Sequence, residues 1–88
     1  MEDQGFRPNP YIVARFLERL QRGRLKRTQL QMATGLNWAG FSRYLTRLVE
    51  LGLVELKEEN GEVYITITGK GLELYHSLIG VLSELRGL

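Results

Sequence analysis

Residues 28–54 read TQLQMATGLNWAGFSRYLTRLVELGLV, and their pattern predicts two helices separated by a short break. In the first helix, Thr28 and Gln31 have capping-box spacing, in which each side chain can bond a backbone N–H near the other. This helix is expected to continue to about Thr34, where a glycine follows. The second is expected over residues 38–51, because its apolar residues recur at spacings of four, three and three along one face: Phe41, Leu45, Leu48 and Leu51.

A further helix is predicted upstream of this pair. Asn9 can cap free backbone N–H groups, and Pro10 at the first helical position has no N–H to lose. Residues 24–27 are too few for a helix and are expected to form a short strand, whereas residues 1–8 have no periodicity and are expected to be a flexible N-terminal segment. The upstream helix is expected to end at Gly23, and its apolar face consists of Ile12, Val13, Phe16, Leu17 and Leu20.

Downstream, the apolar period changes from helical to alternating, which is typical of strands. Asn60 and Gly61 tolerate the positive φ of a type I′ turn, so the two strands around them are predicted to form a β-hairpin. Thr68 can then cap a last helix over about residues 70–86. The apolar positions of the two strands are Val54, Leu56, Val63, Ile65 and Ile67.

Helix, short strand, helix, turn, helix, hairpin, helix is the element order of a winged helix-turn-helix domain, an α+β fold that is mainly α. Residues 28–54 resemble winged-helix transcription regulators, whose recognition helix carries Ser-Arg-x-Leu-x-x-Leu and whose wing opens with Gly-Leu-Val. Residues 64–74, YITITGKGLEL, are similar to the run that joins wing to last helix in small archaeal DNA-binding proteins of this group. The resemblance implies a three-helix core with a wing in a DNA-binding domain, residues 9–68, and a C-terminal dimerisation helix, residues 69–88.

Composition narrows the class of protein further. With 88 residues, 43% of them hydrophobic, the chain can form one compact core. It has no cysteine for disulfides or thiolate zinc sites, no signal-like start, and no apolar run near the roughly 20 residues that span a bilayer, so a cytoplasmic protein without membrane contact is expected. Residues 7–47 contain nine basic residues and one acid, whereas residues 48–88 contain three and seven. A basic half of this kind suits a polyanionic partner.

Base contacts are expected from the third predicted helix, because the second helix of a helix-turn-helix lies in the major groove. Arg43 and Arg47 are one turn apart, so one can pair with guanine or phosphate while the other holds the backbone. Ser42 and Thr46 are short donors that suit phosphate. Two roles stay open for Trp38: a contact to a thymine methyl or sugar, or a staple between the turn and the core. The candidate contacts in this region are Asn37, Trp38, Ala39, Ser42, Arg43, Thr46 and Arg47.

The loop before the second helix is a candidate for phosphate contacts, since free N–H groups at a helix start favour anions. Its candidate residues are Arg24, Lys26, Arg27 and Thr28, with Arg22 beside them. The wing departs from the DNA-binding pattern, because residues 57–62 contain three carboxylates where arginine or lysine is usual. From the wing, only Lys57 is expected to contact DNA.

The last helix carries more apolar surface than one edge of a small domain needs, which is typical of an interface. Tyr75, Leu78, Leu82 and Leu85 are spaced by three, four and three, as in a short coiled-coil seam. The alternative is that this helix folds back entirely on its own domain. The predicted dimer interface consists of Leu72, Tyr75, Leu78, Ile79, Leu82 and Leu85.

No set of residues indicates catalysis, a cofactor or a metal site. His76 is the only histidine, and no cluster of carboxylates accompanies it. Residues 69–71, Gly-Lys-Gly, lack the preceding part of a phosphate-binding loop. The sequence therefore predicts a homodimeric double-stranded DNA-binding protein that regulates transcription, without enzymatic activity or cofactor. The alternative is a winged-helix module that binds another protein, which the acidic wing and the apolar last helix would suit.

Overall fold

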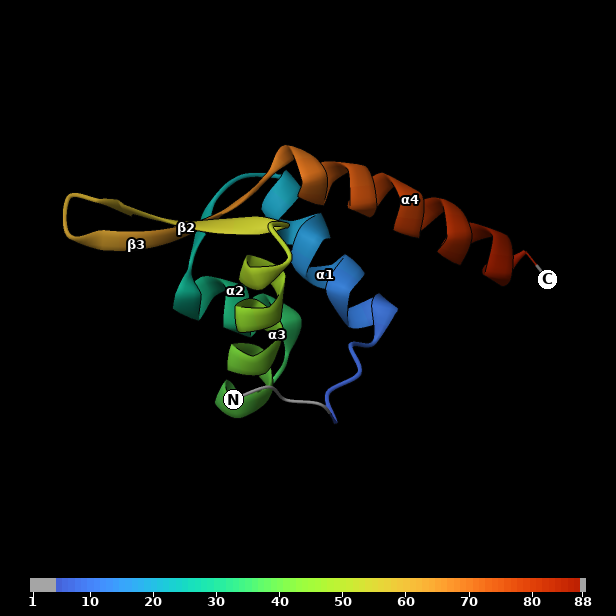
Figure 1. The fold of residues 1–88 in the computed structure, drawn as a ribbon, viewed down its shortest axis with the longest axis horizontal. Coiled ribbons are helices and arrows are strands. Elements are labelled where there is room, and N and C mark those ends of the chain that lie inside the picture. Colours follow the sequence, from blue (N-terminus) through green and yellow to red (C-terminus); the bar gives the residue numbers. More distant parts are fainter. Residues whose placement is uncertain (1–4, 88) are drawn as a thin grey trace.

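The computed structural model describes residues 5–87 and has the predicted order of elements (Figure 1). Helices α1, α2 and α3 form the body of the molecule, and the β2–β3 hairpin and α4 extend from it in opposite directions. The prediction of a mainly α fold with a β-hairpin is confirmed. In this part of the chain there are four helices and three strands: α1 Pro10–Gln21, β1 Leu25–Lys26, α2 Arg27–Thr34, α3 Trp38–Glu50, β2 Val54–Glu59, β3 Glu62–Ile67 and α4 Gly69–Arg86.

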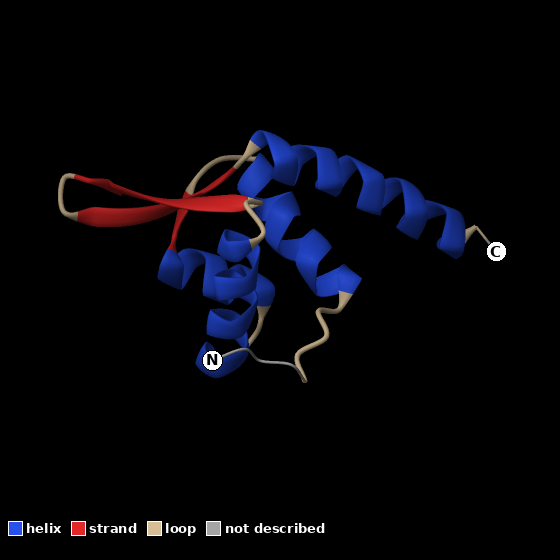
Figure 2. Ribbon diagram, viewed as in Figure 1, coloured by secondary structure: helices blue, strands red, loops and turns tan. Residues whose placement is uncertain are grey.

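The three strands form one antiparallel sheet in the order β1-β3-β2 (Figure 2). Lys26 of β1 pairs with Tyr64, and Glu59 and Glu62 face each other next to the turn. Asn60 has φ 53° and Gly61 has φ 80°, the positive values that a type I′ turn requires. The hairpin and its turn are therefore confirmed, and the short strand before α2 joins the hairpin through β3.

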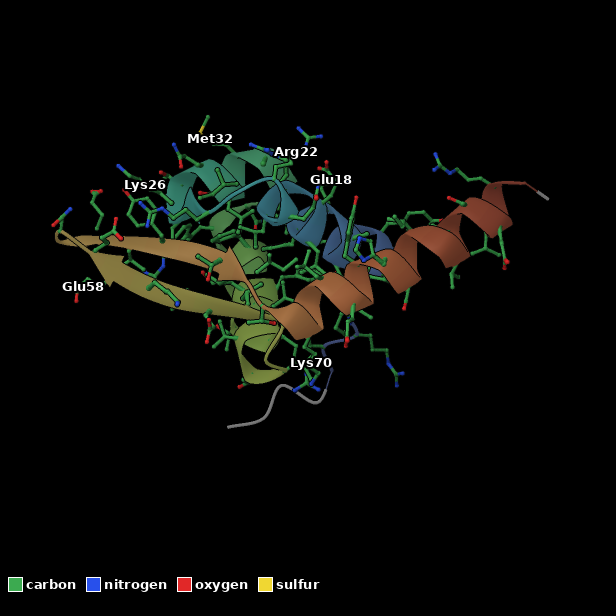
Figure 3. The ribbon with its side chains drawn as sticks, turned by 90° about the horizontal axis from the view of Figure 1, so that it is seen from above. Glu18, Arg22, Lys26, Met32, Glu58 and Lys70 are labelled. Atoms are coloured by element: carbon green, nitrogen blue, oxygen red, sulfur yellow. The ribbon has the colours of Figure 1, made fainter. Side chains whose placement is uncertain are left out.

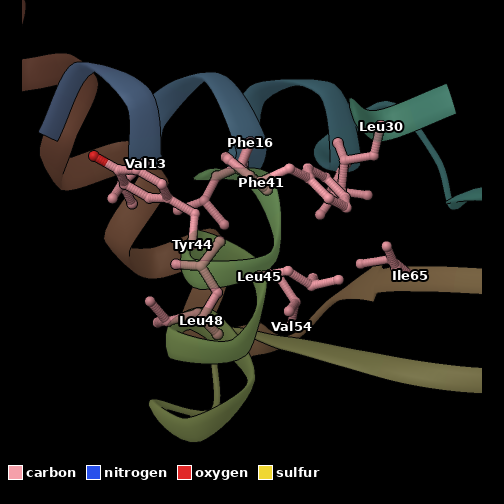
Figure 4. Packing of buried hydrophobic residues seen from close by; sticks show 12 residues of the cluster. Val13, Phe16, Leu30, Phe41, Tyr44, Leu45, Leu48, Val54 and Ile65 are labelled. Carbon is pink, nitrogen blue, oxygen red and sulfur yellow. The ribbon is translucent and has the colours of Figure 1, made fainter. Parts of the chain in front are cut away.

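One apolar cluster lies where α1, α3 and the base of the hairpin meet (Figure 4). Phe16 of α1 and Phe41 of α3 are fully buried, and their rings stack with centroids 5.6 Å apart. Tyr44 stacks on Phe16 at 5.8 Å. This packing fixes which face of α3 points inward and therefore which side chains it presents outward. The other buried members are Val13, Leu17, Leu20, Leu30, Leu45, Leu48, Leu53, Val54 and Ile65.

The start of α2 differs from the prediction. The helix begins at Arg27, one residue before Thr28, and Gln29 closes its first turn by accepting a hydrogen bond from the Lys26 N–H at 2.9 Å. The predicted capping box between Thr28 and Gln31 is therefore wrong. Because Lys26 pairs with β3, the sheet determines where the strand ends and the helix begins, and local spacing alone does not reveal this.

The inward face of α3 is completed by Tyr44 and not by Leu51. Leu51 caps the helix end and is 39% exposed, because the chain turns away at Gly52, so its predicted place in the buried stripe is wrong. The Tyr44 hydroxyl accepts a hydrogen bond from the Asn9 N–H at 2.8 Å, and the Tyr44 ring meets Phe6 edge-on at 5.0 Å. The segment before α1 was predicted to be flexible; its residues 1–4 lie outside the described residues, and Phe6 packs against the core.

A junction of side-chain hydrogen bonds joins α3, the hairpin and α4. The Thr68 hydroxyl donates to the Gly52 carbonyl at 2.7 Å and accepts from the Gly71 N–H at 3.0 Å, which confirms it as the cap of α4. The Lys70 ammonium donates to the Leu51 carbonyl at 2.7 Å, and thereby satisfies a free carbonyl at the end of α3. These contacts fix the direction in which α4 leaves the body.

Candidate nucleic-acid interface

The outward face of α3 is the centre of the candidate interface. Its N-terminus is capped by Asn37, whose Oδ1 accepts a hydrogen bond from the Gly40 N–H at 2.8 Å. Because helical positions three and four apart share a face, the residues opposite the buried stripe form one exposed row. Four predicted DNA contacts are exposed together in this row: Ala39, Arg43, Thr46 and Arg47.

Two arginines carry the positive charge of this row. The Arg47 Nη1 lies 3.4 Å from the Glu50 Oε1, and half of the Arg47 side chain is exposed, so this ion pair is weak and exchangeable. The Arg43 guanidinium lies 4.7 Å from the ring centroid of Phe6, a cation–π contact that positions it beside the helix start. Neither neighbour was predicted. The spacing of Arg47 and Glu50, three positions apart on one helix, could have revealed the ion pair, whereas the contact of Phe6 with Arg43 depends on the fold.

The other predicted contacts around α3 are placed differently. Asn37 uses its side-chain oxygen as the helix cap. Trp38 is 51% exposed, and its ring lies 5.5 Å from that of Phe41, so it packs on the core and keeps an accessible side. Ser42 is half-buried beside the exposed row. The packing of Trp38 on Phe41 fits the predicted staple between the turn and the core. The exposed side of its ring stays available for the predicted contact to a thymine methyl or sugar.

The basic residues before α2 contact the wing. The Arg24 Nη2 lies 2.8 Å from the Glu59 Oε1, and the Lys26 Nζ lies 3.0 Å from the Glu62 Oε2. The Arg24 guanidinium also lies 4.0 Å from the centroid of the Tyr64 ring. Figure 3 shows Lys26 beside β3. Two of the predicted phosphate contacts are therefore engaged by carboxylates of this same chain.

Unlike Arg24 and Lys26, the other basic residues of this region, Arg22 and Arg27, have no ion pair with the wing among the described contacts. Arg27 and Thr28 are exposed in the first turn of α2, where an anion would meet free N–H groups. Arg22 is held on α1 by Glu18, with its Nε 2.7 Å from the carboxylate oxygen, and Figure 3 shows the two side chains next to each other. Of this group, Arg27 and Thr28 are best placed to meet a phosphate.

The ion pairs between the wing and the segment before α2 shift the pKa values of Arg24, Lys26 and Glu59. The hydrogen bond and charge of Arg24 lower the pKa of Glu59, and the hydrogen bond that Arg24 donates to Glu59 raises the pKa of Arg24. The hydrogen bond to Glu62 raises the pKa of Lys26. Since the pKa of Glu59 is lower in the folded protein, its contribution to stability is present above its unfolded-state pKa and is lost as pH falls through the folded-state value. The Arg24–Glu59 pair is therefore fully charged at neutral pH.

Lys57 lies on the same face of the hairpin as these pairs. It is opposite Tyr64 in the register, and its ammonium is 4.0 Å from the Glu55 Oε1. Its side chain is exposed, but its neighbours on this face include the carboxylates Glu55 and Glu59. Lys57 is thus accessible in a locally acidic setting.

The predicted dimer residues divide along α4. Tyr75 and Leu78 pack against the core of their own chain, as does Leu74. Farther along, Leu85 is 52% exposed, and its neighbour Val81, which was not among the predicted members, is 54% exposed. The other predicted members, Leu72, Ile79 and Leu82, are exposed or half-buried, and the last two line a groove of about 320 Å³ between α1 and α4.

Neither a metal-ligand cluster nor a helix suited to a bilayer is found among the described residues. Among residues 5–87, no group of three or more histidine, cysteine or acidic side chains is placed to hold a metal ion. None of the helices in the same range has the length and apolar character needed to cross a membrane. His76 lies with its ring 5.6 Å from that of Tyr75 on α4.

The exposed second helix of the α2–α3 pair, followed by a β-hairpin, defines a helix-turn-helix protein with a wing. Residues 7–85 match the model of the winged helix-turn-helix family, and the chain belongs to this family. No curated protein sequence matches it.

Several solved structures are similar to the chain. Sso10a-2, a DNA-binding protein from Sulfolobus solfataricus, has 25% identity and a TM-score of 0.80 over 92% of this chain and 84% of that one. The homodimeric winged helix-turn-helix DNA-binding domain Mb0332 from Mycobacterium bovis, a possible ArsR-family transcriptional regulator, has 28% identity and a TM-score of 0.67 over 84% and 68%. The transcriptional regulator BldR from Sulfolobus solfataricus shares the fold at 19% identity and a TM-score of 0.78, over 85% of this chain and 56% of BldR.

Proposed function

We propose that this protein binds double-stranded DNA through the outward face of α3 and acts as a dimeric transcription regulator. The observation that carries the proposal is the exposed row on α3, where Arg43 and Arg47 stand one turn apart beside the small side chain of Ala39. A helix with such a face fits the major groove, which is about 12 Å wide. The similarity to Sso10a-2, itself a DNA-binding protein, and to the DNA-binding domain Mb0332 also supports DNA binding.

Each part of the interface would have its own task. Arg43 and Arg47 would pair with guanine edges or phosphates, and Thr46 would donate to a nearby phosphate. Arg27 and Thr28 would meet the backbone at the start of α2. These contacts need no cofactor and no chemical step, so the protein would act by binding alone.

The test of DNA binding is the affinity for a fluorescently labelled duplex, measured by anisotropy from about 50 to 200 mM salt. Binding through phosphates releases counterions, so the logarithm of the affinity is expected to fall with the logarithm of salt, with a slope near −0.9 for each phosphate neutralised. Weak binding that does not depend on salt would contradict the proposal and would favour the alternative, a module that binds another protein.

The second part of the proposal is dimerisation through α4. The apolar face that packs Leu74 and Leu78 against the core continues through Val81, Leu82 and Leu85, where α4 extends beyond the rest of the chain (Figure 1). Apolar side chains in such a position stay in water unless a second molecule covers them. A second α4 would do so, and Mb0332, which shares this fold, is homodimeric.

Light scattering with size-exclusion chromatography tests the dimer. The wild-type protein is expected to have twice the mass of one chain at micromolar concentration, and Val81→Glu/Leu85→Glu is expected to be monomeric because two carboxylates would be desolvated at the seam. His76→Glu/Ser83→Glu is the control, since these exposed positions lie on the opposite side of α4. A monomeric wild type, or a Val81→Glu/Leu85→Glu variant that stays dimeric, would contradict this interface.

A further inference from the structure

The polar face of the wing holds two carboxylates in an unfavourable arrangement. Glu59 and Glu62 are cross-strand partners beside the turn, and like charges directly opposite each other destabilise a hairpin. Each is compensated by a cation from outside the hairpin: Arg24 lies 2.8 Å from Glu59, and Lys26 lies 3.0 Å from Glu62. The wing thus carries two negative charges that the segment around β1 neutralises.

The same two cations are next to the candidate DNA interface. Lys26 is the residue that caps the start of α2, and Arg27, which is exposed, follows it directly. The Arg24 and Lys26 side chains are each 44% exposed, so a phosphate could reach both charged groups. Because exposed ion pairs are weak, the carboxylates can be exchanged for another anion.

We propose that Glu59 and Glu62 act as internal counter-ions that compete with DNA phosphates for Arg24 and Lys26. The inference rests on the proposed DNA binding and adds a control on its strength. To use either cation, DNA must displace a carboxylate, and the released carboxylate then lies close to the negative duplex. The wing therefore lowers the affinity and the number of phosphates that the protein neutralises.

The test compares two pairs of substitutions that change the net charge equally. Glu59→Gln/Glu62→Gln frees both cations. Glu58→Gln/Glu73→Gln is the matched control, because both carboxylates are exposed and neither pairs with Arg24 or Lys26: Glu58, labelled on β2 in Figure 3, points to the opposite face of the hairpin, and Glu73 lies on α4. Circular dichroism checks that all variants fold, as is expected for exposed positions.

Duplex affinity over a salt series is the first readout. Two additional phosphate contacts are expected to steepen the log–log slope of the Glu59→Gln/Glu62→Gln variant by about 1.8, so that its affinity falls on the order of tenfold more than that of wild type between about 50 and 200 mM salt. At the lower salt, this variant is expected to bind more tightly than the control pair. Equal slopes and affinities for the two pairs would overturn the inference, since only the overall charge would then matter.

A third variant assigns the gain to the two cations. When Arg24→Ala/Lys26→Ala is added to Glu59→Gln/Glu62→Gln, the steeper slope is expected to disappear, whereas the same alanines in the wild-type wing are expected to change the slope little. A gain that survives these alanines would overturn the inference.

Elution from immobilised heparin is a readout that does not need duplex binding. The Glu59→Gln/Glu62→Gln variant is expected to elute at higher salt than the control pair, because heparin is also a polyanion that recruits free cations. If wild type fails to bind the duplex but the heparin shift is present, the proposed function fails and the competition stands. If the duplex binds and neither readout separates the two pairs, the competition fails and the proposed function stands.

Discussion

Replacing Phe41 by alanine is expected to lower the free energy of unfolding by about 3–5 kcal/mol. The Phe41 ring is fully buried between Phe16 and Trp38, with centroid distances of 5.6 and 5.5 Å. It therefore joins α3 to α1, and its loss removes the transfer energy of the ring and leaves a cavity. Since small domains are stable by only about 5–15 kcal/mol, the change is a large part of the total. Urea unfolding followed by circular dichroism measures it.

Met32→Ala is the control for this prediction. Met32 lies on α2 with 80% of its surface exposed, and Figure 3 shows its side chain pointing away from the body. Removing a side chain that is already in water is expected to change stability by less than about 0.5 kcal/mol. Similar losses for Phe41→Ala and Met32→Ala would contradict the described core.

Gly71→Ala is expected to cost about 2–3 kcal/mol, for a steric reason. Gly71 is buried in the first turn of α4, and a Cβ at this position would overlap the carbonyl oxygen of Leu53 and lie 2.8 Å from the Cγ1 of Ile67. The obstacle is mainly backbone, so the helix start itself has to move. That movement would also stretch the hydrogen bond from the Gly71 N–H to Thr68.

Gly69→Ala, two residues earlier, separates this effect from a general change in the helix. Nothing lies within 4 Å of the Cβ that alanine would add at Gly69. The free energy of unfolding of the Gly69→Ala protein is therefore expected to equal that of wild type or to be slightly higher. Thermal and urea unfolding of both variants provide the comparison. A Gly71→Ala protein as stable as Gly69→Ala would show that α4 does not pack this closely on the hairpin base.

Local signals explain why much of the fold could be predicted. Asn9 with Pro10, Asn60 with Gly61, and Thr68 each determine the conformation of a few adjacent residues, and all three features are present in the structure. The spacing of apolar residues is also a local signal, and it correctly predicted which of the longer elements are helices and which are strands.

Features that depend on distant partners could not be predicted in this way. Tyr44 is inward, where its ring stacks on Phe16 and its hydroxyl meets the Asn9 N–H, 35 positions earlier in the chain. From the sequence, Arg24 was predicted to contact phosphate, and the acidic residues 57–62 were predicted to contribute little to DNA binding, whereas the fold brings Arg24 and Glu59 together. Charge counts along a chain do not contain such pairings, because they arise from the register of the sheet.

The central claim is that the outward face of α3 binds DNA. Its most direct test is the duplex affinity of Arg43→Ala/Arg47→Ala, followed over the same salt series as wild type. The control is His76→Glu/Ser83→Glu, which changes the net charge by the same amount on α4, across the molecule from α3 in Figure 1. We expect the arginine variant to bind on the order of a hundredfold more weakly, with a slope closer to zero by up to about 1.8, and the control to bind nearly as wild type. Equal affinities for the two variants, or no change from wild type in either, would contradict a DNA interface on α3.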